Sequence, residues 1–374
     1  MKWRMFICAI CFLIGGCSLN IPLEDQFSDP DAITDVLSAR SLLASAYKAM
    51  PQQIFQLSVL SDDFCPSQHL NKDMSLQGLY NWREVEMTEL AGTLWAGYYA
   101  VIAEVNALLA RIDAVVTLDE TEKLEKMRIV CEAKALKSWC YFDLLRLFAP
   151  RYEGNENKDG IILKKRVELD FLPRSSVKEC VTEIRTLLNE ARNVDNTQKN
   201  VYWLSDKAVA YLQVELELYA GNYPAVLELT KDLETEYPES VLGADVYKYL
   251  WSSENSDARI FGKYQLEQIY MDIRFDTFEK GDYLVLSQNV DYEEEDIRKE
   301  WSEIPFVMPD AKNVRLLGKY NKMNRDKVAS KYVNVARAAG MWLMRVEALA
   351  RSGKEGDAVA LANRMLKQRG ATEW

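Results

Sequence analysis

Aromatic and polar residues between positions 62 and 82 are the part of the chain best suited to contact a ligand. Trp82 falls outside the helical spacing of the apolar residues that follow it, and Tyr80 stands beside it. The flat face of an indole or phenol ring can stack on the apolar C–H face of a sugar ring, whose hydroxyls then need polar partners. Trp82 is therefore the first candidate for ligand contact, and the alternative is that it packs a loop onto a helical frame. The polar partners offered by this segment are Asp62, Asp63, His69 and Asn81.

The sequence carries little of what an enzyme needs. With one histidine, His69, a His-based metal cage is not expected, and no Gly-x-Ser-x-Gly elbow supports a serine triad. No phosphate-cradling glycine loop and no dinucleotide fingerprint is present. We expect no catalytic residue, no cofactor and no metal. Two alternatives stay open: a surface glycan-active enzyme, because 57 Asp and Glu offer many carboxylate pairs, and calcium binding at the acidic run Glu293–Asp296.

The charge of the chain argues against nucleic acid as a partner. The net charge is −11 at pH 7, and removing the two cationic residues Lys2 and Arg4 lowers it to −13. Such a surface does not favour nucleic acid or anionic lipid headgroups. After the first sixteen residues no stretch is apolar for about 18 residues, so no further membrane span is expected.

The first residues form a secretion signal rather than part of the fold. A charged start is followed by an apolar run from Met5 to Ile14, which is too short to span a bilayer permanently. The ending Leu13–Cys17 resembles a bacterial lipobox, in which the chain is cut before the Cys and the Cys is acylated. We expect a signal peptide over 1–16, lipidation of Cys17 and a polar tether over 17–28. An ordinary signal peptide is the alternative.

Four cysteines remain after Cys17, namely Cys65, Cys131, Cys140 and Cys180. Cys131 and Cys140 are nine residues apart on one expected helix, which puts them on roughly opposite faces. They are therefore not expected to bridge each other. We expect buried free thiols, with disulfides as the alternative.

Two long amphipathic helices over 94–150 form the expected centre of the fold. A short polar break at 113–119 separates them, with Thr117 and Glu120 as a capping box, and Pro150 ends the second. A short break between two such helices predicts an antiparallel pair that needs further helices around it. The residues expected to face inward are Leu94, Tyr98, Val101, Val105, Leu108 and Ile112, then Ala133, Leu136, Cys140, Leu144 and Leu147.

Two single helices are expected on either side of this pair. The first runs over Asp29–Met50, with Asp29 as its cap and Pro51 as its stop. The second runs from Ser175 or Ser176 to about Arg192.

Two helix–turn–helix units follow, over 205–238 around Gly221 and over 340–369 around Gly353. Their spacing resembles the tetratricopeptide helical hairpin, and two unrelated hairpins are the alternative. In the first helix of the second unit the residues expected to face inward are Leu343, Val346 and Ala350.

The segment 240–333 alternates aromatic and charged residues without helical spacing. Strand-like pieces are expected at 259–264 and 283–286. Long structured loops on a rigid helical frame often carry binding sites. Trp251 and Trp301 are therefore further candidates, for the opposite wall of the ligand site.

The pattern as a whole predicts a mostly α fold with a little sheet. We expect a single domain over 29–374, with irregular, loop-rich segments at 52–92 and 240–333.

Several motifs, in a shared order, resemble the SusD/RagB family of nutrient-binding lipoproteins from the outer membrane of Bacteroidetes. Their shared order is more specific than any one of them. Together they cover most of the chain after Cys17: Pro22–Gln26, Ser45–Tyr47, Trp95–Asn106 with its aromatic pair, Glu132–Lys137, Tyr141–Leu144, Phe148–Pro150, Leu172–Val177, Asp296-x-Arg298 and the hairpin Ala336–Gly370.

The resemblance implies a SusD-like helical frame with tetratricopeptide-like pairs. It also implies a cell-surface lipoprotein of the outer membrane that hands an oligosaccharide or glycoconjugate to a TonB-dependent, SusC-like transporter. In the family, sugar-binding aromatics often lie in the loop before the first core helix, where Trp82 falls. Members usually continue well past the last hairpin, whereas this sequence stops at Trp374. A truncated or degenerate member without full transporter docking is therefore the alternative.

Overall fold

The computed structural model describes eleven stretches of the chain, and the structural statements below concern these residues only. They are 33–51, 54–61, 64–66, 74–168, 170–192, 201–252, 256–264, 284–286, 292–307, 313–319 and 332–374.

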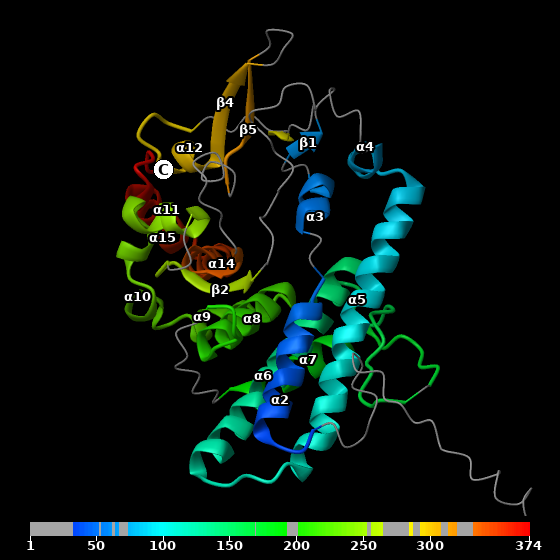
Figure 1. Ribbon diagram of the computed structural model, residues 1–374. Coiled ribbons are helices and arrows are strands. Elements are labelled where there is room, and N and C mark those ends of the chain that lie inside the picture. The colour runs from blue at the N-terminus through cyan, green and yellow to red at the C-terminus, as the bar shows by residue number, and fades with distance from the viewer. Residues whose placement is uncertain are drawn as a thin grey trace, which may run out of the picture.

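The described chain is a helical frame with two small sheets, which confirms the predicted fold class (Figure 1). The helices are α2 (Val36–Ala49), α3 (Ile54–Leu60), α4 (Met74–Tyr80), α5 (Glu84–Arg111), α6 (Glu120–Phe148), α7 (Val177–Ala191), α8 (Asp206–Tyr219), α9 (Tyr223–Leu229), α10 (Leu233–Glu236), α11 (Ala244–Ser252), α12 (Ile297–Ser302), α14 (Ala338–Arg351) and α15 (Glu355–Arg369). Two 3-10 turns, η1 (Ile112–Ala114) and η2 (Glu239–Leu242), extend α5 and precede α11.

The antiparallel pair of α5 and α6 is confirmed, and it runs the full height of the lower frame (Figure 1). All six residues expected to face inward from α5 are buried, as are four of the five from α6. The fifth, Leu147, is 39% exposed, so its predicted burial is wrong. It lies in the last turn of α6, beside the buried Leu144 and Leu145.

The turn between these helices differs from the prediction in two respects. The cap of α6 is Asp119, whose carboxylate accepts from Glu122 N at 2.8 Å, so Thr117 and Glu120 do not form the capping box. The turn is also less polar than expected, because Val116 and Leu118 are exposed in it.

Helix α2 packs along the α5–α6 pair and begins later than predicted. Its cap is Asp35, which forms a reciprocal capping box with Ser38. The predicted cap Asp29 lies outside the described residues. Arg40 ties α2 to α6 through Glu125 at 2.6 Å and the fully buried Glu132 at 3.0 Å.

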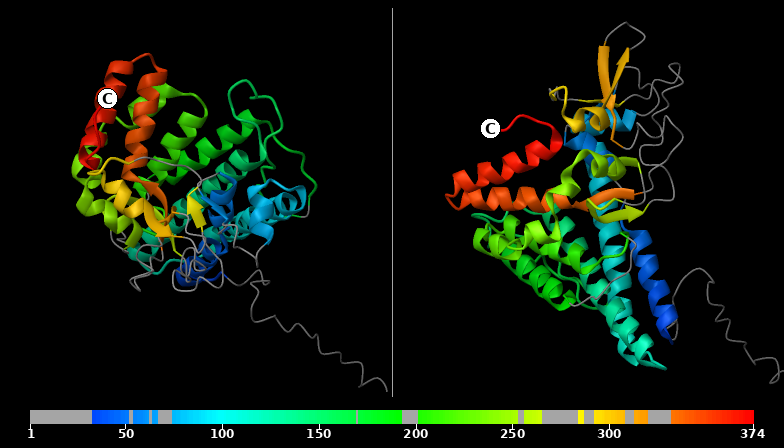
Figure 2. Two further views of the ribbon diagram at one scale, coloured as in Figure 1. Left: turned by 90° about the horizontal axis from the view of Figure 1, so that it is seen from above. Right: turned by 90° about the vertical axis from the view of Figure 1, so that its left-hand side faces the viewer.

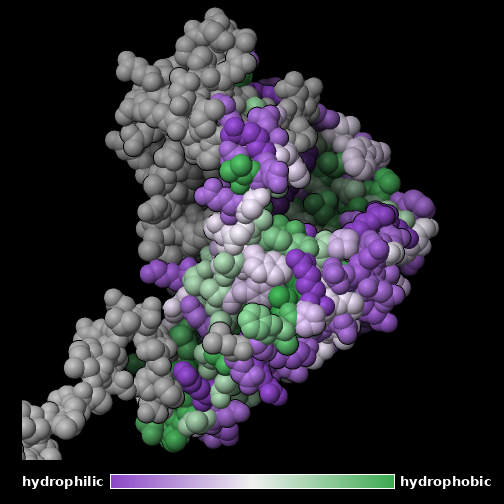
Figure 3. All heavy atoms as spheres, turned by 90° about the vertical axis from the view of Figure 1, so that its right-hand side faces the viewer, coloured by the Kyte–Doolittle hydropathy of each residue, from purple (hydrophilic) through white to green (hydrophobic). Residues whose placement is uncertain are grey.

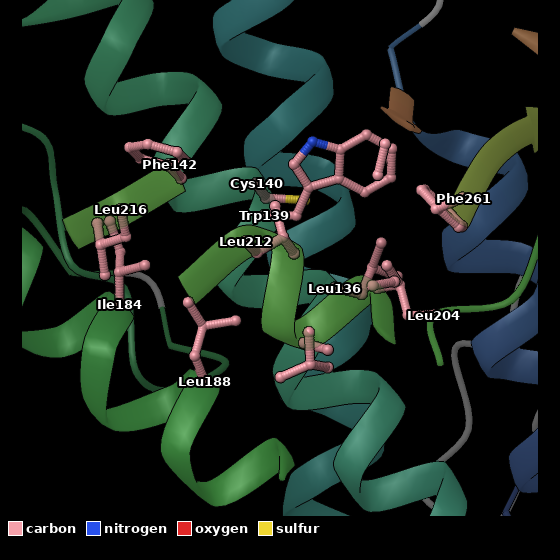
Figure 4. Packing of buried hydrophobic residues seen from close by; sticks show 14 of the residues in the cluster. Leu136, Trp139, Cys140, Phe142, Ile184, Leu188, Leu204, Leu212, Leu216 and Phe261 are labelled. Atoms are coloured by element: carbon pink, nitrogen blue, oxygen red, sulfur yellow. The ribbon is translucent and has the colours of Figure 1, made fainter. Parts of the chain in front are cut away.

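Helices α7, α8 and α9 close the frame behind α6. The capping box of α7 joins Ser176 and Glu179, as the serine at this position predicted. Figure 4 shows the core where α6, α7 and α8 meet, with Trp139 edge-on to Phe261 at 5.1 Å. Burial of such large apolar side chains is the main stabilising contribution to the frame.

Both predicted helical hairpins are present and lie side by side, with α14 against α9 (Figure 2). Their turns contain Gly221 and Gly353, each at positive φ. The inward face predicted for α14 is wrong for Leu343, which is 55% exposed, and for Ala350, whereas Val346 packs against the core. The buried face is offset by one residue and carries Trp342, which donates from Nε1 to Tyr237 O at 3.0 Å.

The two small sheets lie in the segments predicted to be irregular. Strands β2 (Arg259–Tyr264) and β3 (Leu284–Leu286) confirm both predicted strand pieces. Strand β2 pairs antiparallel with β6 (Tyr332–Arg337). The other sheet has the order β1-β3-β5-β4, with β1 at Phe64–Pro66, β4 at Glu303–Val307 and β5 at Asn313–Leu317.

The segment 52–92 holds more regular structure than predicted. It contains α3, β1 and α4, and α5 begins at Glu84, ten residues before the first predicted inward residue, Leu94. The described part of this segment is therefore a set of short elements that lead into α5.

One described helix, Glu84–Ala114, is long and apolar enough to cross a membrane by length and composition, a test that core helices also pass. The sequence was not expected to contain such a stretch. Leu94, Val101 and Ile102 of this helix are buried in contact with the rest of the frame, so it serves as a core helix here.

The four cysteines are free thiols in the structure. Cys140 and Cys180 are buried, whereas Cys65 and Cys131 are half-buried. Burial raises the pKa of the Cys140 thiol well above its usual range, so this group stays protonated and inert.

Candidate ligand-binding site at the α4–α5 elbow

Trp82 lies at the elbow between α4 and α5 and shows its side chain to solvent. Its side chain is 63% exposed. Its φ is +54°, and among described residues other than glycine it is the only one with positive φ. The left-handed region disfavours residues with a Cβ by about 1–2 kcal/mol, so this backbone is strained at a residue that contributes little to the core.

The strain comes from the way α4 ends. Trp82 N donates to Leu79 O at 3.0 Å, and Arg83 N donates to Gly78 O at 2.9 Å. These two bonds are the Schellman motif, which satisfies the last carbonyls of a helix and requires a left-handed residue just past its end. Glycine usually holds that position, since it has no Cβ.

Three other helix ends in this chain use the same two bonds with glycine in the left-handed position. They are Gly221 after α8, Gly353 after α14 and Gly370 after α15, with φ between +69° and +72°. Only Trp82 departs from this rule among the described ends of this type. The elbow therefore places an exposed indole where local stability favours glycine.

An ion pair closes the elbow on its inner side. Arg83 Nη2 lies 2.5 Å from Glu86 Oε1, and the two residues are three apart at the start of α5. The pair sits directly on Gly78 of α4, where a Cβ would overlap the Glu86 carboxylate and lie 2.6 Å from Arg83 Nη2. Gly78, Arg83 and Glu86 thus fix the angle at which α4 meets α5 and hold Trp82 at its apex.

The two residues before Trp82 along the chain, other than the elbow residues above, differ in burial: Tyr80 is packed and Asn81 is exposed. Tyr80 is half-buried and packs against the main core. Asn81 is exposed. Its side-chain Nδ2 donates to Gln77 O at 2.7 Å, and its side-chain oxygen takes no part in that hydrogen bond. Asp62, Asp63 and His69 lie outside the described residues, as does Cys17.

Trp251 and Trp301 share one small apolar cluster that does not include Trp82. Both belong to a small apolar cluster around α11, in which Trp251 is 3% exposed. The rings of Tyr247 and Trp251 pack edge to face at 5.8 Å. Figure 1 places α11 and α4 on opposite sides of the molecule. In the described structure Trp251 is a packing residue, and a ligand contact by Trp251 or Trp301 stays a prediction.

The acidic run at Glu293–Asp296 is engaged with other protein groups. Glu293 accepts from Thr372 N at 2.9 Å, Glu294 pairs with Lys299 at 2.7 Å, and the buried Asp296 pairs with Arg298. Among the described residues no group of three or more His, Cys, Asp or Glu is arranged to hold a metal ion.

Sequence reasoning selected Trp82 as a candidate but missed what positions it. The spacing of three between Arg83 and Glu86 is a signal for a helical ion pair and could have placed the start of α5 at 84. Gly78 had no such signal, because its role depends on the approach of a side chain from the next helix.

A family model covers residues 23–214 of the chain and is described as starch-binding, associating with the outer membrane. This span is just over half of the chain and includes α2 to α7, the elbow and the first part of α8. A comparison with curated proteins finds no match.

Several solved structures from Bacteroides have the same fold. A SusD superfamily protein from Bacteroides thetaiotaomicron aligns with a TM-score of 0.73 at 16% identity, over 90% of this chain and 81% of that one. A SusD superfamily protein from Bacteroides fragilis gives 0.68 at 19% identity, over 91% and 81%. A SusD-like carbohydrate-binding protein from Bacteroides vulgatus gives 0.66 at 16% identity, over 91% and 77%. Together with the family model, these findings identify the chain as a member of the SusD/RagB family.

Proposed function

We propose that this chain is a lipid-anchored, cell-surface protein of the outer membrane that binds a glycan through Trp82 and delivers it to a TonB-dependent, SusC-like transporter. The family description supports sugar binding and association with the outer membrane. The observation that carries the choice of Trp82 is its strained, exposed position at the end of α4.

The physical argument rests on a local conflict. A left-handed residue with a Cβ is disfavoured by about 1–2 kcal/mol, and the exposed indole of Trp82 recovers little of this through packing. Strained backbone persists in proteins mainly at sites where it serves binding or catalysis. A rigid aromatic surface held toward solvent is well suited to stack on a sugar ring.

The rim of the elbow offers polar partners for sugar hydroxyls. Asn81 is exposed beside the indole. The side chain of Arg83, the next residue in the chain, is 48% exposed and is held by Glu86. A carboxamide and a guanidinium offer donors, and the carboxamide also offers an acceptor. Ligand contacts by Asp62, Asp63 and His69 belong to the same proposal.

Anchoring and delivery complete the proposed role. Lipidation of Cys17 would hold the protein at the membrane, and more than one acyl chain is needed for stable anchoring. Mass spectrometry of the N-terminal peptide from outer membranes should show acylated Cys17, and an unmodified or uncleaved terminus contradicts the anchor. Pull-down from gently solubilised outer membranes should recover a large β-barrel partner, and recovery of the lipoprotein alone contradicts delivery.

We infer binding without turnover. The motifs of nucleophilic, metal-assisted and cofactor-dependent catalysis are missing from the sequence. Incubation of the purified chain with each glycan it binds should leave the glycan intact. The inference is contradicted if the wild-type chain releases shorter products and a variant in which one Glu or Asp is replaced does not.

A screen against arrayed polysaccharides and glycoproteins tests the proposed ligand class. The wild-type chain should retain at least one glycan, and Trp82→Ala should weaken its binding about tenfold, because an aromatic ring contact contributes about 0.5–1.5 kcal/mol beyond the apolar area that it buries. Trp374→Ala is the matched control, since Trp374 is 83% exposed at the other end of the chain. Equal loss in both variants, or retention in Trp82→Ala, contradicts the site.

A further inference from the structure

Five exposed apolar side chains gather at one end of the frame, which we call the apolar tip. Figure 3 shows hydrophobic atoms at this lower end of the molecule. The tip is formed by the first turn of α2, the α5–α6 turn and the start of α6. Its members are Leu37, 75% exposed; Val116, 72%; Leu118, 85%; Leu124, 52%; and Met127, 56%.

The α5–α6 turn is held in one shape. Lys126 Nζ donates to Asp113 O at 3.1 Å and to Val115 O at 2.8 Å. Leu118 N donates to the Glu122 carboxylate at 2.7 Å. Val115 is buried under the turn, whereas the next residue, Val116, is exposed to solvent. A helix–helix turn is usually polar at the surface, so this one presents apolar side chains on a braced support.

The tip lies where the chain enters the fold. Helix α2 begins beside the α5–α6 turn in both Figure 1 and the side view of Figure 2. Sixteen peptide steps separate Cys17 from Ile33, the first described residue, and they span at most about 58 Å. The far end of α5, by Glu84, lies about 42 Å farther along that 28-residue helix. A fully extended tether of this length could pass that far end, so its length alone does not orient the fold. The tip is favoured because the described chain begins beside it (Figure 1), and a lipid at Cys17 reaches the membrane from this end by the shortest path.

Three ion pairs lie beside the tip, and the acidic residues Asp113 and Asp119 are exposed in the turn itself. Arg40 pairs with Glu125 at 2.6 Å, Arg128 with the same Glu125 at 3.7 Å, and Lys123 with Glu120 at 3.4 Å. A surface with paired charges and exposed aliphatic side chains favours contact with the apolar boundary of a lipid layer rather than with charged headgroups. We propose that the apolar tip rests in the lipid surface of the membrane that carries the anchor, an inference that depends on the proposed lipidation of Cys17.

Depth-dependent fluorescence quenching tests this proposal on the full lipidated chain. An environment-sensitive dye is attached at Leu118→Cys in a chain with Cys65→Ser and Cys131→Ser, the two half-buried thiols. The protein is reconstituted on phosphatidylcholine vesicles with and without a nitroxide lipid. The matched control carries the dye at Leu343→Cys, which is exposed on α14. We expect the dye at position 118 to lose at least about half of its emission to the nitroxide, since tips of this kind enter the headgroup boundary, and the dye at position 343 to lose none.

The outcomes distinguish failure of the proposed lipid contact by the apolar tip from failure of the proposed lipidation of Cys17. If the chain stays on the vesicles and position 118 is quenched no more than position 343, the tip proposal is overturned and the anchor stands. If the chain does not stay on the vesicles, the anchor fails and the tip proposal with it. Adding Val116→Asp to the chain labelled at 118 should lower the quenching at least about twofold; unchanged quenching there contradicts a lipid contact at the tip.

Discussion

Trp82 and Gly370 hold the same position at the ends of two helices, α4 and α15. Each residue is left-handed, with φ of +54° and +70°, and each is followed by a residue whose N–H reaches back five positions to close the helix. Gly370 meets the requirement of that geometry without strain. Trp82 adopts the same geometry with strain, because it has a Cβ, and it is also exposed. Among the described helix ends of this type Trp82 alone carries the strain, and the proposed ligand-binding role of Trp82 is based on this difference.

The glycines at these helix ends should differ in their tolerance of a Cβ. Gly353→Ala should lower the free energy of unfolding by about 1–2 kcal/mol, because it places alanine in the left-handed region with open space around it. Gly370→Ala should cost clearly more, since its Cβ would also overlap the carbonyl of Glu295. Chemical denaturation of both variants measures the difference. Equal losses would contradict the close approach at Gly370.

The buried carboxyl of Glu132 should make stability depend on pH. Burial raises the pKa of this group from 4.5 to about 7, and the ion pair with Arg40 only partly offsets that effect. A raised pKa in the folded state means that the contribution to stability is fully present below pH 4.5 and is lost as pH rises through about 7. Across this window the wild-type chain should lose up to about 3 kcal/mol relative to Glu132→Gln.

Denaturation of wild type and Glu132→Gln at pH 5, 6, 7 and 8 checks this sign. The two chains should be nearest in stability at the acid end, where Glu132 is protonated and resembles glutamine. A wild-type chain that instead gains stability over the variant toward pH 8 would mean that the ion pair with Arg40 outweighs burial.

Two adjacent residues of α14 test which face of that helix is buried. Trp342→Phe removes the donor to Tyr237 O and should lower stability by about 1–3 kcal/mol. Leu343→Ala should change it by no more than about 0.5 kcal/mol, because Leu343 is largely exposed. Thermal unfolding of the two variants compares them directly. A larger effect at Leu343 would restore the face predicted from sequence.

The frame could be predicted from sequence because its signals are repetitive and local. The inward residues of α5 recur over several turns, and the caps at Ser176 and Ser205 stand next to the helices they begin. Errors arose where the signal was short. Leu147 lies in the last turn of α6, where Leu144 and Leu145 are buried and Leu147 is exposed. The α14 face containing Leu343 was offset by one residue in a helix apolar on several sides.

The candidate site could be predicted only in part. Trp82 was recognised because it breaks helical spacing, but its left-handed backbone follows from how α4 ends, which no local pattern showed. The packing of Trp251 in a small core also depends on contacts with distant residues such as Val333. Identity and spacing therefore indicated which aromatic residues to consider, and tertiary contacts decided which of them reaches solvent.

The most direct test of the account is a paired measurement on Trp82→Gly, with glycan affinity from calorimetry and the free energy of unfolding from denaturation. Glycine removes the indole and relieves the left-handed strain together. The account predicts that binding of the screened glycan is lost while stability stays the same or rises by about 1 kcal/mol. Retained binding, or a clear loss of stability with binding intact in the folded fraction, would contradict Trp82 as the ligand surface.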